Sequence, residues 1–245
     1  MNGPSDLCFH SAVELRRMLA AGEVSALEVL DAHIARIEKY DGVLNAIVTR
    51  CFDEARERAA SGRLTGPLAG LPVAHKDLTE TAGLRTTYGS PLFADNVPAE
   101  DSLLVARIKA AGAVTIGKTN TPEFGAGSQT FNRVFGATRN PHDRSRTCGG
   151  SSGGAAVALA ARFLPIADGS DMGGSLRNPA AFCNVVGLRP SPGRVPSGWK
   201  EERAWSDLST QGPMARSVDD LALLLSAVAG PDPRVTNVLP EAGET

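Results

Sequence analysis

Two clusters rich in glycine and serine contain the residue types needed for acyl-transfer chemistry. They are Gly149-Gly-Ser-Ser-Gly-Gly154 and Asp171-Met-Gly-Gly-Ser175, and seven glycines lie between Cys148 and Ser175. Glycine is favoured where a backbone turns sharply or approaches another group closely. Successive N–H groups in such a turn can bind an anion or the oxyanion of an acyl-transfer transition state. The clusters therefore indicate either two flexible loops or an anion-binding nest that includes Ser175.

Two familiar motifs match this sequence formally but not in context. Gly112-Ala-Val-Thr-Ile-Gly-Lys-Thr119 fits the P-loop pattern, but residues 113–116 are predicted to form a strand rather than a phosphate-binding loop. Gly149-Gly-Ser-Ser-Gly153 fits a nucleophile elbow centred on Ser151, but a charged, turn-like segment precedes it where a strand is expected. Hydrolases with a nucleophile elbow take their base from a histidine that follows the serine in the sequence. None of the four histidines here lies at such a position, so another base is required.

Lys76 is the best candidate for this base. It follows the apolar run Leu71-Pro-Val-Ala-His75, which can carry it into the interior at the end of a strand. Burial removes the hydration of an ammonium group and lowers its pKa, and a neutral lysine can deprotonate a serine hydroxyl. The alternative is a lysine at a strand end that reaches solvent. Position alone leaves both interpretations open.

Helices alternate with short apolar strands along the chain. Two capping boxes, Ser11-Ala-Val-Glu14 and Ser25-Ala-Leu-Glu28, predict helix starts. Further helices are expected over 52–60, 102–111, 155–163 and 217–229, and strands over 71–74, 113–116, 164–167 and 185–188. Such alternation predicts α/β layers around a largely parallel sheet. The segment 231–245 is rich in Pro, Gly and polar residues and is expected to be a linker-like tail.

Composition narrows the setting in which this chemistry would occur. The 245 residues carry a net charge of −2, which gives no reason to expect direct contact with a nucleic acid. The four cysteines form no C-x-x-C pair, which favours free thiols in a reducing compartment. Because the sequence has no apolar run of membrane-spanning length and no signal peptide, we expect a cytoplasmic protein without membrane contact. No metal-binding cluster is evident.

Four ordered blocks of sequence carry a family resemblance. They are residues 70–77 (GLPVAHKD), 117–124 (GKTNTPEF), 148–190 with both glycine clusters, and 212–216 (GPMAR). Over residues 11–230 the chain resembles the amidase-signature family of serine hydrolases. The resemblance implies the amidase-signature α/β fold, a mixed and mostly parallel sheet flanked by helices, in a single domain over 1–245.

The resemblance also implies a Ser–Ser–Lys catalytic triad. Ser175 matches the nucleophile, Ser151 the bridging serine that follows a cis peptide bond after Gly150, and Lys76 the base. In this arrangement neutral Lys76 accepts a proton through Ser151 while Ser175 attacks an amide carbonyl. An acyl-enzyme forms, the amine leaves and water completes the hydrolysis. The reaction calls for no metal and no organic cofactor.

Other matched positions are expected to support the triad. The backbone N–H groups of Met172, Gly173, Gly174 and Ser175 match an oxyanion hole. Ser152, Asp171 and Arg177 match positions that support the site by hydrogen bonding, and Ser170 stands where threonine is usual. Ser128, Phe131 and Trp205 are our candidates for lining the substrate pocket.

Three functions fit these expectations. The first is hydrolysis of a small or aryl carboxylic amide, and the second is the glutaminase subunit of a tRNA-dependent amidotransferase. The third is a truncated, inactive amidase fragment, because family members continue well beyond the length of this chain. We therefore expect a small-molecule amide as substrate, and as partner a second chain or C-terminal fragment that completes the fold, or a second copy in a homo-oligomer.

Overall fold

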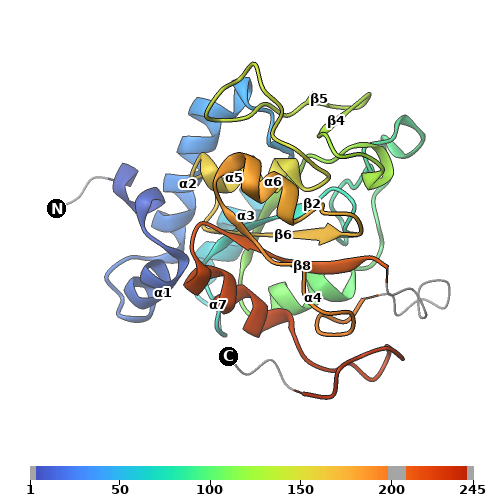
Figure 1. Ribbon diagram of the computed structural model, residues 1–245. Coiled ribbons are helices and arrows are strands. Elements are labelled where there is room, and N and C mark those ends of the chain that lie inside the picture. The colour runs from blue at the N-terminus through green and yellow to red at the C-terminus, as the bar shows by residue number, and fades with distance from the viewer. Residues whose placement is uncertain (1–3, 198–207, 242–245) are drawn as a thin grey trace.

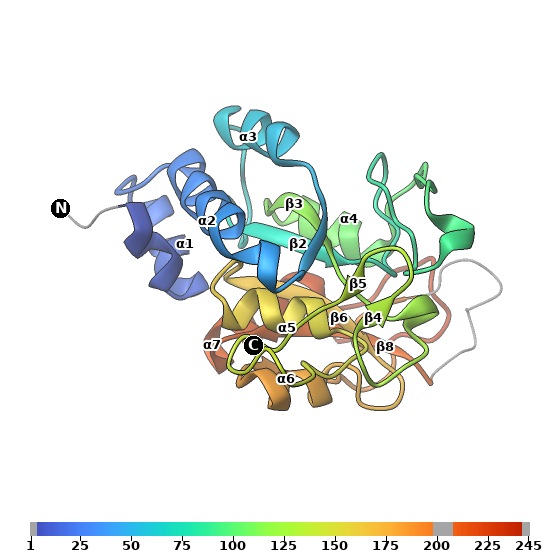
Figure 2. The same cartoon turned by 90° about the horizontal axis from the view of Figure 1, so that it is seen from above.

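A central layer of strands separates two layers of helices (Figures 1 and 2). The structure, a computed structural model, describes residues 4–197 and 208–241. The strands of the central layer are β1 (Ile47–Arg50), β2 (Pro72–Lys76), β3 (Val114–Thr119), β6 (Ile166–Asp171), β7 (Val186–Gly187) and β8 (Thr210–Ala215). A separate two-stranded hairpin consists of β4 (Phe131–Asn132) and β5 (Gly136–Ala137). The α/β class expected from the sequence is confirmed.

The helices divide between the two faces of this layer. One face packs against α2 (Ala26–Tyr40), α3 (Phe52–Ala60), α5 (Gly153–Ala160) and α6 (Arg177–Cys183). The other packs against α1 (Ala12–Ala20), α4 (Leu103–Ala110) and α7 (Val218–Val228). Short 3₁₀ turns occur at Pro4–Phe9, Asp41–Val43, Pro91–Phe93 and Glu123–Gly125. In Figure 1, α5 and α6 lie above the strands and α4 and α7 lie below them.

Alternating side chains on the strands build both hydrophobic cores. On β2, Val73 packs in the core with α1, α4 and α7, and Ala74 packs in the opposite core. The same alternation separates Ile166 from Ala167 on β6. Successive side chains of a strand point to opposite faces, so a single strand layer can serve two cores. The shared layer makes the two helical layers depend on each other.

Strand direction differs from the expectation of a mostly parallel sheet. Only β2 and β3 pair in parallel among the described strands. The pairs β1–β3, β6–β8 and β7–β8 are antiparallel. The alternation of helices and strands in the sequence predicts whether an element joins the helical or the strand layer. It does not predict the direction of a strand, which depends on the end of the sheet at which the chain re-enters. The β1–β3–β2 sheet is mixed and the β6–β8–β7 sheet is antiparallel, so the strand layer as a whole is mixed, as the family resemblance implied.

Helix starts were predicted more accurately than strand limits. Both capping boxes form, at Ser11 and Ser25, and the helix expected over 52–60 is α3. The strand expected over 113–116 continues as β3 to Thr119, which places Lys118 inside a strand and removes the P-loop interpretation. The strand expected over 164–167 becomes β6 and continues to Asp171. The sequence patterns gave no indication of β1, β8 or α6.

Strands β2 and β6 lie side by side although they belong to different hydrogen-bonded sheets. The amine of Lys76, the final residue of β2, reaches the hydroxyl of Ser170 near the end of β6 at 3.1 Å. Sites in open α/β sheets occur at the carboxyl ends of strands. The second glycine cluster follows β6 directly, and the first brings Ser151 and Ser152 to Lys76 at the same edge.

The first turn of α5 packs against main chain rather than side chains. A Cβ atom at Gly154 would lie 2.3 Å from the backbone nitrogen of Asn120 and 2.9 Å from the carbonyl oxygen of Ala46. The Gly154 N–H donates to the Asn120 carbonyl at 3.2 Å. Only glycine permits this approach, which fixes the helix directly after Ser151 and Ser152.

The segment 231–241 is packed, although it was expected to be linker-like. It contains no helix or strand, but Val235 is buried and Arg107 donates to the carbonyl oxygen of Pro231 at 2.7 Å. Gly193 accepts a further hydrogen bond from Leu239. A composition rich in Pro and Gly excludes regular structure without excluding packing. Residues 242–245 lie outside the described residues.

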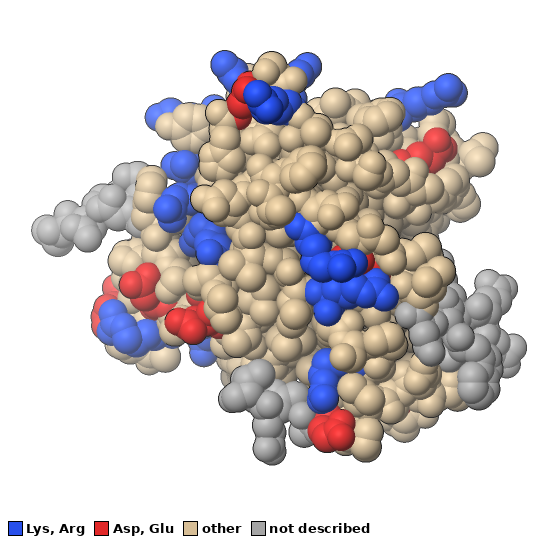
Figure 3. Space-filling model, in the orientation of Figure 1, with Lys and Arg blue, Asp and Glu red and all other residues tan. Residues whose placement is uncertain are grey.

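Surface charge is distributed in small groups. On the face shown in Figure 3, charged side chains form small groups with uncharged surface between them, and several groups contain both basic and acidic side chains. Within residues 4–197 and 208–241, no helix combines the length and the apolar character needed to cross a bilayer.

Replacing Gly154 by alanine should destabilise the protein. Gly→Ala inside a helix normally gains about 1 kcal/mol from helix propensity, but here the new methyl group meets backbone atoms. We expect the free energy of unfolding in urea to fall by about 1–3 kcal/mol. Gly42→Ala is the matched control, because no atom lies within 4 Å of its Cβ position. A Gly154→Ala protein at least as stable as the wild type would contradict this packing.

Candidate active site

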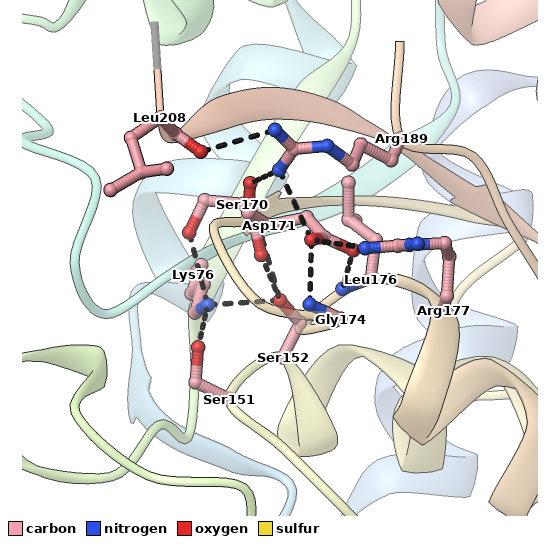
Figure 4. Close-up of polar contacts among 10 residues, drawn as sticks. All are labelled: Lys76, Ser151, Ser152, Ser170, Asp171, Gly174, Leu176, Arg177, Arg189 and Leu208. Atoms are coloured by element: carbon pink, nitrogen blue, oxygen red, sulfur yellow. Dashed lines mark hydrogen bonds and ion pairs between the residues drawn. The ribbon is translucent and has the colours of Figure 1, made fainter. Parts of the chain in front are cut away.

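The amine of Lys76 lies among three serine hydroxyls (Figure 4). Lys76 Nζ is 2.7 Å from Ser151 Oγ, 2.9 Å from Ser152 Oγ and 3.1 Å from Ser170 Oγ. An ammonium group has three protons and can donate to all three oxygens. A neutral amine donates two protons and can accept the third, so the same arrangement suits both protonation states. Lys76 and Ser151, which the family resemblance implied as partners, are in direct contact.

Burial controls the protonation of this lysine. The Lys76 side chain is 0% exposed, and desolvation lowers its pKa from 10.5 to about 7. The negative charges of Asp168 and Asp171 act in the opposite direction and limit the shift. A pKa near neutrality means that both forms of Lys76 are populated at physiological pH. The expectation that Lys76 is buried at a strand end is confirmed, and the alternative in which it reaches solvent is wrong.

The segment that carries Ser151 is held by the side chain of Thr130. The Gly150–Ser151 peptide bond is cis, as the family resemblance implied. Thr130 Oγ1 donates to the Gly149 carbonyl at 2.9 Å and accepts the Gly153 N–H at 3.1 Å. These contacts bracket Ser151 and Ser152 on both sides. The position of the turn that carries these hydroxyls therefore depends on hydrogen bonds between its main chain and the Thr130 side chain.

Ser175 is adjacent to this turn through its backbone. Its carbonyl accepts the Ser152 N–H at 3.2 Å, which aligns the two serine-bearing segments. The Ser175 side chain is partly exposed, whereas Ser151 and Ser152 are buried. Within the described residues, no hydrogen bond joins the Ser175 hydroxyl to Ser151 or Lys76. The structure thus brings Ser151 to Lys76 directly and brings Ser175 beside them by its main chain.

Asp171 organises the loop that leads to Ser175. Its carboxylate accepts the N–H groups of Gly174 at 2.8 Å and Leu176 at 3.1 Å. Arg177 forms two further bonds to it, both 3.0 Å. Burial would raise the pKa of Asp171, but the Arg177 guanidinium and the two N–H groups outweigh it and hold this pKa well below its usual range. Asp171 is therefore ionised near neutral pH.

The predicted oxyanion hole is altered at one position. The Gly174 N–H is already bound to Asp171, so it is not available to an oxyanion. Gly174 adopts a φ of +115°, which favours glycine and turns its N–H inward. Within the described chain, the N–H groups of Met172, Gly173 and Ser175 have no acceptor. Three of the four predicted donors remain free to bind a negative oxygen.

Ser170 and Arg189 were given no role by the sequence analysis. Ser170 Oγ is the third hydroxyl on Lys76, and Arg189 bonds to both the carbonyl and the carboxylate of Asp171. The signal for Ser170 is alternation, because it lies two residues beyond Asp168 on the same side of β6. That signal was hidden because the strand was expected to end at residue 167. Nothing comparable marks Arg189 apart from its place in a matched block.

The candidate pocket residues have different outcomes. Ser128 and Phe131 are exposed, and Trp205 lies outside the described residues. Over the described part of the chain, no group of three or more His, Cys, Asp or Glu side chains could hold a metal ion.

Comparisons with known proteins show the family to which this chain belongs. The model of the Amidase family matches residues 28–244. The A subunit of the glutamyl-tRNA(Gln) amidotransferase of Thermus thermophilus is 52% identical over 225 residues, which cover 91% of this chain and 47% of that protein. The chain therefore belongs to the amidase family.

Solved structures agree with this assignment. A bacterial aryl acylamidase of the amidase-signature family aligns with a TM-score of 0.90 and 35% identity, covering 95% of this chain and 50% of that one. 6-Aminohexanoate cyclic dimer hydrolase in complex with substrate aligns with a TM-score of 0.90 and 37% identity, covering 98% and 50%. The chain spans about half the length of the relatives that it matches.

The burial of Lys76 should make stability depend on pH. In the folded chain the Lys76 ammonium has a pKa of about 7, whereas its ordinary value is 10.5. Between these values the unfolded chain binds more protons, so the free energy of unfolding rises with pH. Lys76→Met should reduce this rise in urea titrations across that range. Lys39→Met, at an exposed lysine, should leave it unchanged. Parallel curves for Lys76→Met and the wild type would contradict the burial argument.

Proposed function

We propose that this protein is an amidohydrolase that cleaves a carboxylic amide through an acyl-enzyme on Ser175. The observation that carries the proposal is the buried Lys76 amine, with a pKa of about 7, bound to the hydroxyl of Ser151. A base with this pKa is half deprotonated near neutral pH, where general-base catalysis is most effective. The match to the amidase family supports amide bonds as the substrate class.

In the first half of the reaction, Ser175 Oγ attacks the carbonyl carbon of the amide. Its proton passes to Ser151 Oγ, and the proton of Ser151 passes to neutral Lys76 at 2.7 Å. Ser152 and Ser170 accept the other two protons of Lys76 and keep its lone pair directed at Ser151. The carbonyl oxygen becomes an oxyanion, which the free N–H groups of Met172, Gly173 and Ser175 can bind. Losing one such donor typically costs about 3 kcal/mol of barrier.

In the second half the protons return. Lys76 gives its proton back through Ser151 to the amine nitrogen, the C–N bond breaks, and ammonia or an organic amine leaves. Water then attacks the acyl-enzyme as Lys76 again accepts a proton through Ser151, and Ser175 is released with its hydroxyl restored. Asp171 stays ionised throughout and holds the loop before Ser175 in place.

A second polypeptide segment is proposed to cover the site. Met172 is 57% exposed, Phe131 61% and Leu208 64%, and all three lie on segments beside the serine cluster. Large apolar side chains grouped in this way are typical of a surface that another segment covers. We propose a second chain, a C-terminal fragment or a second copy as this cover. The shared strand layer supports treating residues 1–245 as one domain, and the free, mostly buried cysteines support a cytoplasmic location.

The hydrolase proposal is tested with a panel of aryl amides that release a coloured amine. Ser175→Ala should lower kcat by a factor of about 10³ or more. The rate of the wild type should rise with pH to a plateau, with a midpoint near 7 set by Lys76, and Lys76→Ala should lose this dependence. Ser61→Ala, at an exposed serine at the end of α3, is the control. Equal activity in Ser175→Ala and the wild type would overturn the proposal.

A glutaminase that feeds an amidotransferase is the second candidate. It is favoured by the 52% identity to a component of a glutamyl-tRNA(Gln) amidotransferase, against 35% and 37% to the two hydrolases. We expect such a protein to release ammonia from glutamine and to copurify with partner proteins. Ammonia release from glutamine that exceeds release from aryl amides, and that disappears in Ser175→Ala, would support it. A protein that hydrolyses neither substrate would favour the inactive fragment instead.

A further inference from the structure

A buried pair of hydrogen-bonded side chains, His75 and Asp168, lies directly behind Lys76 and takes no part in the proposed reaction. His75 Nδ1 and Asp168 Oδ2 are 2.5 Å apart, and the two side chains are 0% and 1% exposed. An ionised carboxylate only accepts hydrogen bonds, so Nδ1 of His75 carries the proton. The other ring nitrogen, Nε2, is 3.0 Å from Thr115 Oγ1 on β3. The histidine is thus fixed from two strands.

The second oxygen of Asp168 binds the backbone of Lys76. Asp168 Oδ1 accepts the Lys76 N–H at 3.0 Å. On the other side of β2, the N–H of Asp77 donates to the Thr119 carbonyl of β3. Since successive N–H groups of a strand point in opposite directions, the Lys76 N–H points away from β3 and toward β6. A backbone carbonyl of a paired strand would normally accept it, but β2 and β6 are not a hydrogen-bonded pair.

We propose that His75 and Asp168 are positioning residues that join β2 to β6 and hold Lys76 among the serine hydroxyls. Asp168 replaces the missing strand pairing at the residue whose amine must reach Ser151 and Ser170. Because Ser170 lies on β6 and Lys76 on β2, any slippage between the two strands would change the 3.1 Å contact between them. His75 sets the orientation of the carboxylate, and Thr115 sets the orientation of His75.

The charges around His75 and Asp168 also favour a positioning role for them. Lys76 and Lys118 both feel the negative charge of Asp168, and Asp171 is the other acidic group acting on Lys76. The Lys118 amine donates hydrogen bonds to the Thr79 carbonyl and the Thr81 hydroxyl. Asp168 therefore also supplies charge that raises the pKa of Lys76 against the effect of burial. Its removal should be detected at Lys76 even in a protein that remains folded.

The test compares Asp168→Asn and His75→Gln with Asp41→Asn. Asp41 is a matched control because it is 1% exposed and accepts backbone N–H groups of Ala46 and Ile47 at 2.8 and 3.1 Å, away from Lys76. The protein is labelled with ¹³C at lysine Cε, the Lys76 signal is assigned by its loss in Lys76→Arg, and its titration is followed by NMR. We expect Asp168→Asn to lower the Lys76 midpoint by about one pH unit. His75→Gln should move it by a measurable amount, and Asp41→Asn should not move it.

Turnover gives a second, independent readout, and it rests on the proposed amide hydrolysis. We expect kcat of Asp168→Asn to fall by about tenfold or more with KM within about twofold, whereas Asp41→Asn should keep both. Unchanged Lys76 titration and unchanged kcat in Asp168→Asn and His75→Gln would overturn the positioning role. If Asp168→Asn does not fold, His75→Gln decides by the same criteria. The unsubstituted protein could also hydrolyse no amide while Asp168→Asn and His75→Gln still shift the titration of Lys76. That result would support the positioning role and reject the proposed function.

Discussion

The site depends on removing the ammonium of Lys76 from water. A lysine in solvent is protonated at neutral pH and cannot act as a base, whereas full burial brings its pKa to about 7. Burial of a charge without partners is costly, and the three serine hydroxyls provide the compensating hydrogen bonds. The surrounding structure must therefore exclude water and supply hydroxyl groups at the same point, and the strand ends and the two glycine-rich turns do both.

Close backbone contact is how the fold meets this requirement. Gly154 packs against Asn120, which fixes α5 behind Ser151 and Ser152, and Gly174 turns its N–H onto Asp171. The Ser152 N–H then joins the two turns at the Ser175 carbonyl. Side chains at these glycine positions would separate the segments by several tenths of an ångström or more. Gly154 therefore marks a close contact between two segments, and Gly174 marks a turn that needs a positive φ.

The sequence predicted what depends on local pattern or on matched motifs. Capping boxes placed two helix starts, and the ordered blocks named Lys76, Ser151, Asp171 and Arg177, which the structure brings together in one cluster. Contacts between distant strands were not predictable in this way. Asp168 follows an apolar run and looks like a strand-ending charge, and its bonds to His75 and Lys76 exist only because β6 lies beside β2. The occupied N–H of Gly174 has the same origin, since nothing in the order Asp171-Met-Gly-Gly-Ser175 tells which donor the carboxylate takes.

The central claim is that Lys76, acting through Ser151, activates Ser175 and no other serine. It is tested most directly by treating the protein with a fluorophosphonate and mapping the adduct by peptide mass spectrometry. Our account predicts a single adduct on Ser175 that forms faster as pH rises through about 7 and is nearly abolished in Lys76→Met. An adduct on Ser151 or Ser152, or labelling of Ser175 at an unchanged rate in Lys76→Met, would contradict it.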